Sequence, residues 1–264
     1  MSVGPVMKGR VRAWWGEEPC GTRAAKHARG TRAYFEDIEA DRYRREPEIH
    51  AFAQFTRYRG RRVLEVGVGA GTDFIQWTRA GADAWGVDLT PEAIQLVRER
   101  LAEYDLDGTV QVADAEALPF ADDEFDLVYS FGVIHHTPDT YKALGELIRV
   151  TKPGGEIKVM VYNRHSVAAL FIWMRKALQR GVPWHGLKWA IAQLESPGTK
   201  AYTRREVETW AESFQMREVH VSSWRTYYDY QRGHHRIFQV LAKPLAALGG
   251  DRFGFFLGLR AVKA

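Results

Sequence analysis

A glycine-rich stretch at residues 61–73 most constrains what this chain can fold into. Its apolar segment, Val63 to Val66, is typical of a buried strand, and Gly67, Gly69 and Gly71 follow at alternate positions. Glycine tolerates a positive φ and lets a ligand approach the backbone with no Cβ in the way. The stretch therefore predicts a strand, a tight turn and a helix. A turn of this kind can also form without binding anything, so the rest of the chain decides between the two.

Beyond the glycine loop, short apolar strands alternate with helix patterns. Strands are expected at 63–66, 84–87, 110–113, 125–130 and 156–162, and helices at 73–80, 90–104 and 140–150. Thr90 is a typical N-cap because Pro91 follows it at the first helical position. The segment 152–155, Lys-Pro-Gly-Gly, is expected to be a turn. This alternation predicts a parallel sheet with helices on both faces.

The parts of the chain outside this alternation are less regular. Residues 1–30 are expected to be a loosely docked arm that Trp14 and Trp15 pin to the body or to a ligand. Residues 31–58 are expected to form two helices, because Pro47 starts the second.

The C-terminal part holds two aromatic insertions, at 163–200 and 225–254, the first with a helix at 167–178 and the second with one near 237–248. The segment Thr203-Arg204-Arg205-Glu206 is a capping box that starts a helix to Phe214. A strand at 219–224 should pair antiparallel with a last strand at 255–262.

Together these patterns predict one α/β domain, as the length of 264 residues also favours. Its sheet is expected to be seven-stranded, mostly parallel and doubly wound, with an antiparallel last strand. Residues 1–60 would form an N-terminal helical arm over the ligand site, 61–162 the ligand-binding core, and 163–264 the lid insertions and C-terminal strands that complete the same domain.

The charge and the cysteine content indicate which binding partners and which cellular compartment suit this chain. The formal charge is +4 and the pI about 9.1, with much of the basic excess before residue 63. Such an excess indicates either a solvated face or a patch for nucleic acid, an acidic substrate or a membrane surface. Cys20 is the single cysteine, so no internal disulfide can form, which suits a reducing cytoplasm. The sequence predicts neither a signal peptide at the start nor a membrane-spanning helix.

Polar residues follow each of the first four strands, where the carboxyl ends of a parallel sheet meet at one edge. They are Glu65 with the glycine loop, Asp88, Asp114-Ala115-Glu116, and the segment from Ser130 to His136. Asp88 lies 17 positions after Gly71 (88 − 71), close to the offset at which a carboxylate reaches ribose hydroxyls. Asp114 can accept from an adenine amine. Glu65 would repel a pyrophosphate and attract an amine-bearing ligand.

At this point the sequence resembles the class I S-adenosylmethionine-dependent methyltransferases. The resemblance covers residues 60–162 densely, and the strand and helix order to 264 more loosely. The matching motifs are Val63–Gly71, Gly86-Val87-Asp88, Ala113–Phe120, Phe125–Val128 and Lys152–Gly155.

The resemblance implies S-adenosylmethionine as cofactor and a role for each matching residue. Glu65 would hold the methionine ammonium. The methionine and ribose would be lined by Gly67, Gly69 and Gly71. Asp88 would bind the ribose hydroxyls, with Leu89 against the adenine. Asp114 and Ala115 would hold the adenine amine and ring, and Ser130 would contact the amino-acid end through its backbone. Tyr43 in the arm is a further candidate to cover the cofactor.

Catalytic residues are harder to assign, because alignment of an activated methyl group and desolvation can supply most of the acceleration. His135 and His136 lie beside the expected sulfonium and are candidate bases, since histidine titrates in the useful range. The alternative is that the pair packs or caps the next turn. His165, Tyr162 and Tyr202 are weaker candidates. No metal is predicted, because His234-His235 has no carboxylate or cysteine partner nearby.

The acceptor is expected to be a small aromatic or lipophilic metabolite, methylated on O, N or C. Seven aromatic residues of the C-terminal part could wall its pocket or build the core of the lid: Phe171, Trp173, Trp184, Trp189, Trp224, Tyr227 and Tyr228. Two alternatives stay open: an RNA methyltransferase that uses the basic arm, and a non-catalytic S-adenosylmethionine sensor. Peripheral membrane contact is compatible with the charge, and the oligomeric state is undetermined.

Overall fold

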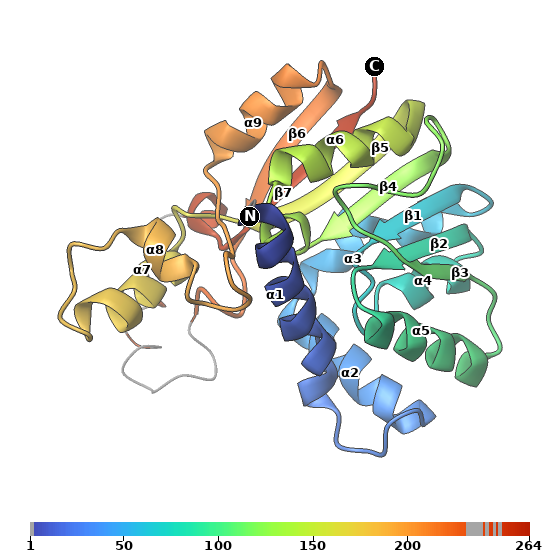
Figure 1. The fold of residues 1–264 in the computed structure, drawn as a ribbon, viewed down its shortest axis with the longest axis horizontal. Coiled ribbons are helices and arrows are strands. Elements are labelled where there is room, and N and C mark those ends of the chain that lie inside the picture. The colour runs from blue at the N-terminus through green and yellow to red at the C-terminus, as the bar shows by residue number, and fades with distance from the viewer. Residues whose placement is uncertain (1–2, 231–239, 241–242, 245–246, 248–249) are drawn as a thin grey trace.

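A seven-stranded sheet organises the computed structural model, which describes residues 3–230, 240, 243–244, 247 and 250–264. The strand order is β3-β2-β1-β4-β5-β7-β6. The strands are β1 (Arg62–Val66), β2 (Asp83–Asp88), β3 (Thr109–Val112), β4 (Phe125–Phe131), β5 (Thr151–Tyr162), β6 (Arg217–Trp224) and β7 (Phe256–Val262). The pairs among β1 to β5 are parallel, whereas β7 is antiparallel to both β5 and β6 (Figure 1). The predicted α/β fold with an antiparallel last strand is confirmed.

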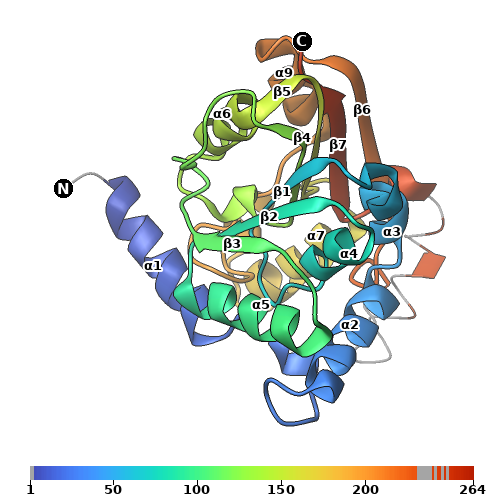
Figure 2. The same ribbon diagram turned by 90° about the vertical axis from the view of Figure 1, so that its right-hand side faces the viewer.

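Helices cover both faces of this sheet (Figure 2). They are α1 (Val3–Glu17), α2 (Arg32–Arg45), α3 (Glu48–Ala53), α4 (Phe74–Arg79), α5 (Pro91–Tyr104), α6 (Thr140–Val150), α7 (Val167–Trp173), α8 (Leu187–Ile191) and α9 (Arg204–Ser213). Alternate residues of a strand point to opposite faces, so Val63 and Leu64 belong to different cores. Val63 packs in a core with α3, α4 and α5, and Leu64 in a core with α6 and α9.

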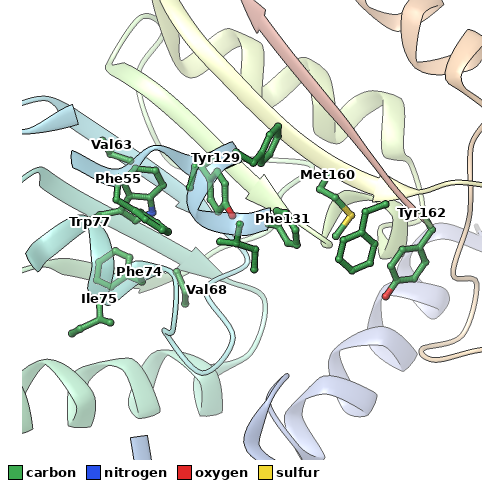
Figure 3. Close-up of a cluster of buried hydrophobic side chains, with 14 of the residues drawn as sticks. Phe55, Val63, Val68, Phe74, Ile75, Trp77, Tyr129, Phe131, Met160 and Tyr162 are labelled. Atoms are coloured by element: carbon green, nitrogen blue, oxygen red, sulfur yellow. The ribbon is translucent and has the colours of Figure 1, made fainter. Parts of the chain in front are cut away.

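The first of these cores contains a continuous row of large side chains (Figure 3). Trp77 of α4 lies edge-on to Tyr129 of β4, at 5.3 Å between ring centroids, and Tyr129 stacks with Phe131. The row continues to Met160 and Tyr162 on β5. Because Phe131 and Tyr162 stand at the carboxyl ends of their strands, this core extends up to the edge of the sheet where ligands bind in folds of this kind.

Most local predictions are confirmed. Thr90 caps α5 by accepting a hydrogen bond from the backbone N–H of Ala93, and Thr203 and Glu206 form both halves of a capping box on α9. The break at Pro47 separates α2 from α3. The first insertion holds α7, which continues into a π-helical turn at Met174–Leu178, and α8. Most of the helix expected near 237–248 lies outside the described residues.

Two expectations were wrong. Residues 3–17 form the helix α1 and not a loose arm, and α1 passes the carboxyl ends of the central strands (Figure 1). The Lys152–Gly155 segment is part of β5 and not a turn before it, although Gly154 has a φ of +77° and the pairing with β4 shifts between Phe125 and Leu127. A glycine pair can accommodate such an irregularity without leaving the sheet. Within the described part of the chain, no helix is both long and apolar enough to cross a membrane.

Arg100 of α5 links the N-terminal helices to the glycine loop. Its side chain is fully buried, donates to Glu39 on α2 at 2.6 Å, and donates to Thr72 Oγ1 at 3.1 Å. We expect Arg100→Met to lower the free energy of unfolding by about 3 kcal/mol, because the partners of a buried cation are left without their donor. Urea denaturation measures this. Arg98→Met changes an exposed residue of the same helix and should lower the free energy of unfolding by less than about 0.5 kcal/mol. Equal losses in the two variants would contradict the role given to Arg100.

Candidate active site

A pocket opens at the carboxyl edge of the sheet. The strand ends contribute residues 66–70, 87–90, 113–115 and 131–133, and further walls come from Arg42, Thr72, Asp73, Ala93 and residues 136–138. Its remaining wall comes from the N-terminal segment: Lys8, Val11, Trp15 and residues 19–21. The predicted convergence of the strand ends is therefore confirmed, and α1 adds a wall that the sequence did not predict.

The glycine loop needs its glycines for two different reasons. Gly67, Gly69 and Gly71 have φ angles of +88°, +52° and +72°, a region that other residues rarely adopt. A Cβ on Gly67 would also lie 2.2 Å from Val133 Cγ2, and one on Gly71 would lie 2.9 Å from Val97. Gly67 and Gly69 line the pocket, while Gly71 lies behind it and allows α5 to pack closely.

Asp88 lines the pocket at the end of β2 and braces the glycine loop. Its Oδ2 accepts from the Gly69 N–H at 3.0 Å, and its Oδ1 accepts from the N–H and hydroxyl of Thr90 at 3.0 and 2.9 Å. Burial raises the pKa of the Asp88 carboxyl, and these hydrogen bonds oppose the rise. Each carboxylate oxygen keeps acceptor capacity for a ligand, because an ionised carboxylate offers about four lone-pair sites. Leu89 lies beside it on the pocket wall.

Asp114 and Ala115 line the pocket at the end of β3. Lys8 of α1 donates to Asp114 Oδ2 and, at 2.8 Å, to Glu116, and Asp114 Oδ1 accepts from the Glu116 N–H. The pKa of the Lys8 ammonium is raised by these carboxylates, against the opposing effect of burial. A ligand amine would therefore share Asp114 with a lysine.

Glu65 does not line the pocket. It lies on the face of β1 that α4 covers, where its Oε2 accepts from the Trp77 indole N–H at 2.8 Å. Burial and the nearby charge of Asp73 raise the pKa of Glu65 well above its usual value. Asp73 itself does line the pocket, paired with Arg42 at 2.9 Å and accepting from Tyr129 at 3.1 Å. Asp73 is therefore an acidic group of the pocket wall next to the glycine loop, and Glu65 lies outside this wall.

Two other predicted residues support the pocket from behind. Tyr43 on α2 donates to the Thr72 carbonyl at 3.1 Å and so holds the end of the glycine loop. Ser130 is fully buried in β4, and the pocket wall begins at the next residue, Phe131. A ligand would meet the Phe131 and Gly132 side of this turn first.

His136 lines the pocket, whereas His135 lies beneath it. The His135 ring is fully buried between His136 and Tyr162, at centroid distances of 4.2 and 4.1 Å, and neither of its nitrogens has a hydrogen-bond partner among the described residues. Trp15 packs edge-on against His136 at 5.3 Å. Burial lowers the pKa of both imidazoles, that of His136 to about 3, so both rings are neutral at pH 7.

The aromatic residues of the insertions contact other parts of the protein and not the pocket. None of the seven named as candidates for a pocket wall lines the pocket in the described part of the chain. Trp173 donates to the His185 carbonyl at 2.6 Å, and His185 stacks on Trp189. Trp224 packs against Phe52 in the sheet core. Trp173 and Trp189 thus take part in the packing of the first insertion, Trp224 belongs to the sheet core, and Trp184 is exposed.

The sequence did not single out the pocket residues Lys8, Cys20, Arg42 and Asp73 as binding residues. Cys20 lines the pocket with an exposed side chain, and a Cβ added to Gly69 would lie 3.5 Å from the Cys20 Cβ. Only Asp73 carried a signal, because it directly follows the glycine loop. The N-terminal residues carried none, since the position of α1 depends on tertiary packing.

The basic residues of the arm are largely paired within the chain. Arg42 binds Glu46 and Asp73, Arg44 and Arg45 both bind Asp41, and Arg57 binds Glu156. Paired guanidinium groups are less available to a phosphate backbone, which favours a solvated face over a nucleic-acid surface. Within the described residues no cluster of three or more metal-binding side chains occurs, and His234-His235 lies outside them.

Comparisons with known proteins agree with this geometry. A methyltransferase domain model matches residues 64–159. An uncharacterised protein of Mycobacterium tuberculosis is 45% identical over 104 residues, which span 39% of this chain and 38% of that protein's length. A demethylmenaquinone methyltransferase of Thermobifida fusca is 30% identical over 187 residues, covering 70% of this chain and 76% of the relative.

Solved structures share the fold. The structure of geranyl diphosphate C-methyltransferase from Streptomyces coelicolor A3(2) matches all of this chain and all of its own, with a TM-score of 0.66 at 15% identity. A methyltransferase structure from Aquifex aeolicus matches 87% of this chain and 97% of its own, with a TM-score of 0.56 at 16% identity. With the domain match, the relative that is 30% identical over 70% of the chain, and the shared fold, the chain belongs to the class I S-adenosylmethionine-dependent methyltransferases.

Proposed function

We propose that this chain transfers the methyl group of S-adenosylmethionine to a small aromatic or lipophilic metabolite. One observation carries the proposal: a single pocket gathers Asp88, Asp114 and two loop glycines at one edge of the sheet. The donor groups of a nucleoside suit these carboxylates, since vicinal hydroxyls and an exocyclic amine all donate hydrogen bonds. The named relatives, methyltransferases of demethylmenaquinone and of ubiquinone biosynthesis, support a small-molecule acceptor.

The pocket residues would divide the binding work. Asp88 would accept from the ribose hydroxyls, Asp114 from the adenine amine, and Asp73 would attract the methionine ammonium. Arg42, which lines the pocket between Glu46 and Asp73, would bind the methionine carboxylate. When bound, the cofactor supplies an already activated methyl group, so these residues contribute chiefly by fixing its position and excluding water.

Trp15 and Phe131 give the rest of the pocket an apolar character suited to an aromatic or lipophilic acceptor. Incubation with methyl-labelled S-adenosylmethionine, total RNA and a small-metabolite extract tests this. Label is expected in the small-molecule fraction; label in RNA would support the RNA alternative instead.

We expect His136→Ala to lower turnover by about 10²-fold, because the loss of a ring from the pocket wall would misplace the acceptor. The affinity for S-adenosylmethionine should stay within threefold, because among the described residues no hydrogen bond or ion pair joins this ring to Asp73, Asp88 or Asp114. His135→Ala should also leave cofactor binding largely intact, since its ring lies beneath the wall. Single-turnover kinetics and calorimetry on both variants measure the two effects separately. Unchanged turnover in both would remove the histidine pair from the mechanism.

A further inference from the structure

Glu195 lies next to His136, in the loop that follows α8. Its Oε2 accepts from the Tyr162 hydroxyl at 3.0 Å and lies 3.5 Å from His136 Nε2. Its other oxygen, Oε1, has no hydrogen-bond partner in the part of the chain that the structure describes. The side chain keeps 35% of its surface accessible, so the carboxyl group is not sealed inside the protein. Figure 3 shows Tyr162 at the end of the aromatic row.

Two hydroxyl groups lie beside Nδ1 of His136. Thr199 Oγ1 donates to the Ser196 carbonyl at 2.7 Å and lies 3.1 Å from Nδ1, so a hydrogen bond between them would be donated by the ring. Ser196 Oγ lies 2.9 Å from the same nitrogen and can either donate or accept. The other nitrogen, Nε2, belongs to a ring only 6% exposed and has no hydrogen-bond partner among the described residues.

The Glu195 carboxylate and the Nε2 side of the His136 ring therefore lie next to each other, and His136 lines the pocket. Burial raises the pKa of Glu195 to about 7, and burial lowers that of His136 to about 3. Of the two, the carboxylate holds a proton far more strongly near neutral pH, since His136 is a weak base here. Four other ionisable groups interact electrostatically with Glu195: Tyr162, Glu46, Cys20 and Tyr228.

From this geometry we propose that Glu195 takes the proton of the methyl acceptor, with His136 Nε2 as its neighbour, and that the acceptor is an aromatic hydroxyl. This inference rests on the proposed function. In the step, the hydroxyl loses its proton to the Glu195 carboxylate and its oxygen forms the new bond to the methyl carbon. The electron pair of the broken carbon–sulfur bond stays on sulfur, and the product is a neutral methyl ether.

A hydroxyl acceptor suits this pair better than an amine. A carboxylate with a pKa near 7 is matched to removing a proton from a phenol, whose own pKa is near 10. A neutral amine attacks through its lone pair and needs no base before the methyl group moves. A carboxylate that merely fastened the insertion to Tyr162 would affect stability and leave the pH profile of turnover unchanged.

The test compares Glu195→Gln with the wild type on 1-naphthol, catechol and hydroquinone, and on the size-matched amine 1-naphthylmethylamine. Methyl-labelled S-adenosylmethionine reports transfer, and Glu212→Gln, the same change at an exposed position of α9, is the control. In the wild type, kcat for the hydroxyl probes should rise with pH through about 7, because the base must be deprotonated. Glu195→Gln should lose about 10²-fold in kcat and lose this rise, with cofactor affinity within twofold.

Thermal unfolding checks that the Glu195→Gln variant folds. The folded-state pKa of Glu195 is raised above 4.5, so its contribution to stability is present below that value and is lost as pH rises towards about 7. Glu195→Gln should therefore be at least as stable as the wild type at pH 8. Wild-type turnover in Glu195→Gln, an unchanged pH profile, or methylation of the amine alone would overturn the proposal. No transfer to any hydroxyl probe by a protein that binds S-adenosylmethionine would also overturn it, whereas failure to bind the cofactor would overturn the proposed function.

Discussion

Replacing Asp88 by alanine is expected to weaken S-adenosylmethionine binding by more than tenfold. The change would remove two charge-assisted hydrogen bonds to the ribose, each worth about 1.5–3 kcal/mol, and tenfold corresponds to about 1.4 kcal/mol. It would also remove the hydrogen bonds that the Gly69 N–H and the Thr90 hydroxyl donate to the Asp88 carboxylate. Asp88→Ala should therefore loosen the glycine loop and weaken cofactor binding together, because both depend on the same carboxylate.

Asp83 offers a matched control, because it lies at the opposite end of the same strand with its side chain 61% exposed. Calorimetric titration with S-adenosylmethionine should give Asp83→Ala the wild-type affinity. Wild-type affinity in Asp88→Ala would instead remove Asp88 from the cofactor site.

Gly67→Ala is expected to abolish measurable cofactor binding and to lower the free energy of unfolding by about 2–5 kcal/mol. The left-handed conformation at φ +88° costs a non-glycine residue about 1–2 kcal/mol, and the methyl group 2.2 Å from Val133 adds an overpacking cost of about 1–3 kcal/mol. Relief of that contact would have to move either the loop or the turn after β4, both of which line the pocket.

Gly154→Ala separates the two causes. Gly154 has a similar φ of +77°, but a Cβ there would meet nothing within 4 Å. The Gly154→Ala variant should lose only the free energy of unfolding that the positive φ costs, and it should keep the wild-type affinity for the cofactor. A Gly67→Ala protein that binds S-adenosylmethionine normally would contradict the role given to the loop. Urea denaturation and calorimetry provide both readouts.

The sheet was predictable because each element carries a local signal. Thr90-Pro91 begins α5, Thr203 and Glu206 cap α9, and the apolar strands between them could pair only in a parallel order. The carboxyl-edge residues Asp88 and Asp114 followed from that order, because parallel strands end at one edge.

Two sets of contacts at the pocket were not predictable, because the residues that make them lie far apart in the sequence. Lys8 reaches Asp114 across 106 positions, and Glu195 approaches His136 across 59 (195 − 136). No local pattern encodes such contacts, which depend on how α1 and the first insertion dock on the core. Glu65 shows the opposite case: its position in the motif was clear, but the alternation of β1 turns its side chain towards Trp77 and not into the pocket.

We propose that this chain transfers a methyl group and does not merely bind its donor as a sensor. Incubation of the wild type and of Asp88→Ala with methyl-labelled S-adenosylmethionine and a small-metabolite extract tests this most directly, with calorimetry of the cofactor on the same preparations. The wild type should bind the cofactor and transfer label to a small molecule, and Asp88→Ala should lose both. Tight binding by the wild type with no label transferred to any acceptor would contradict this proposal.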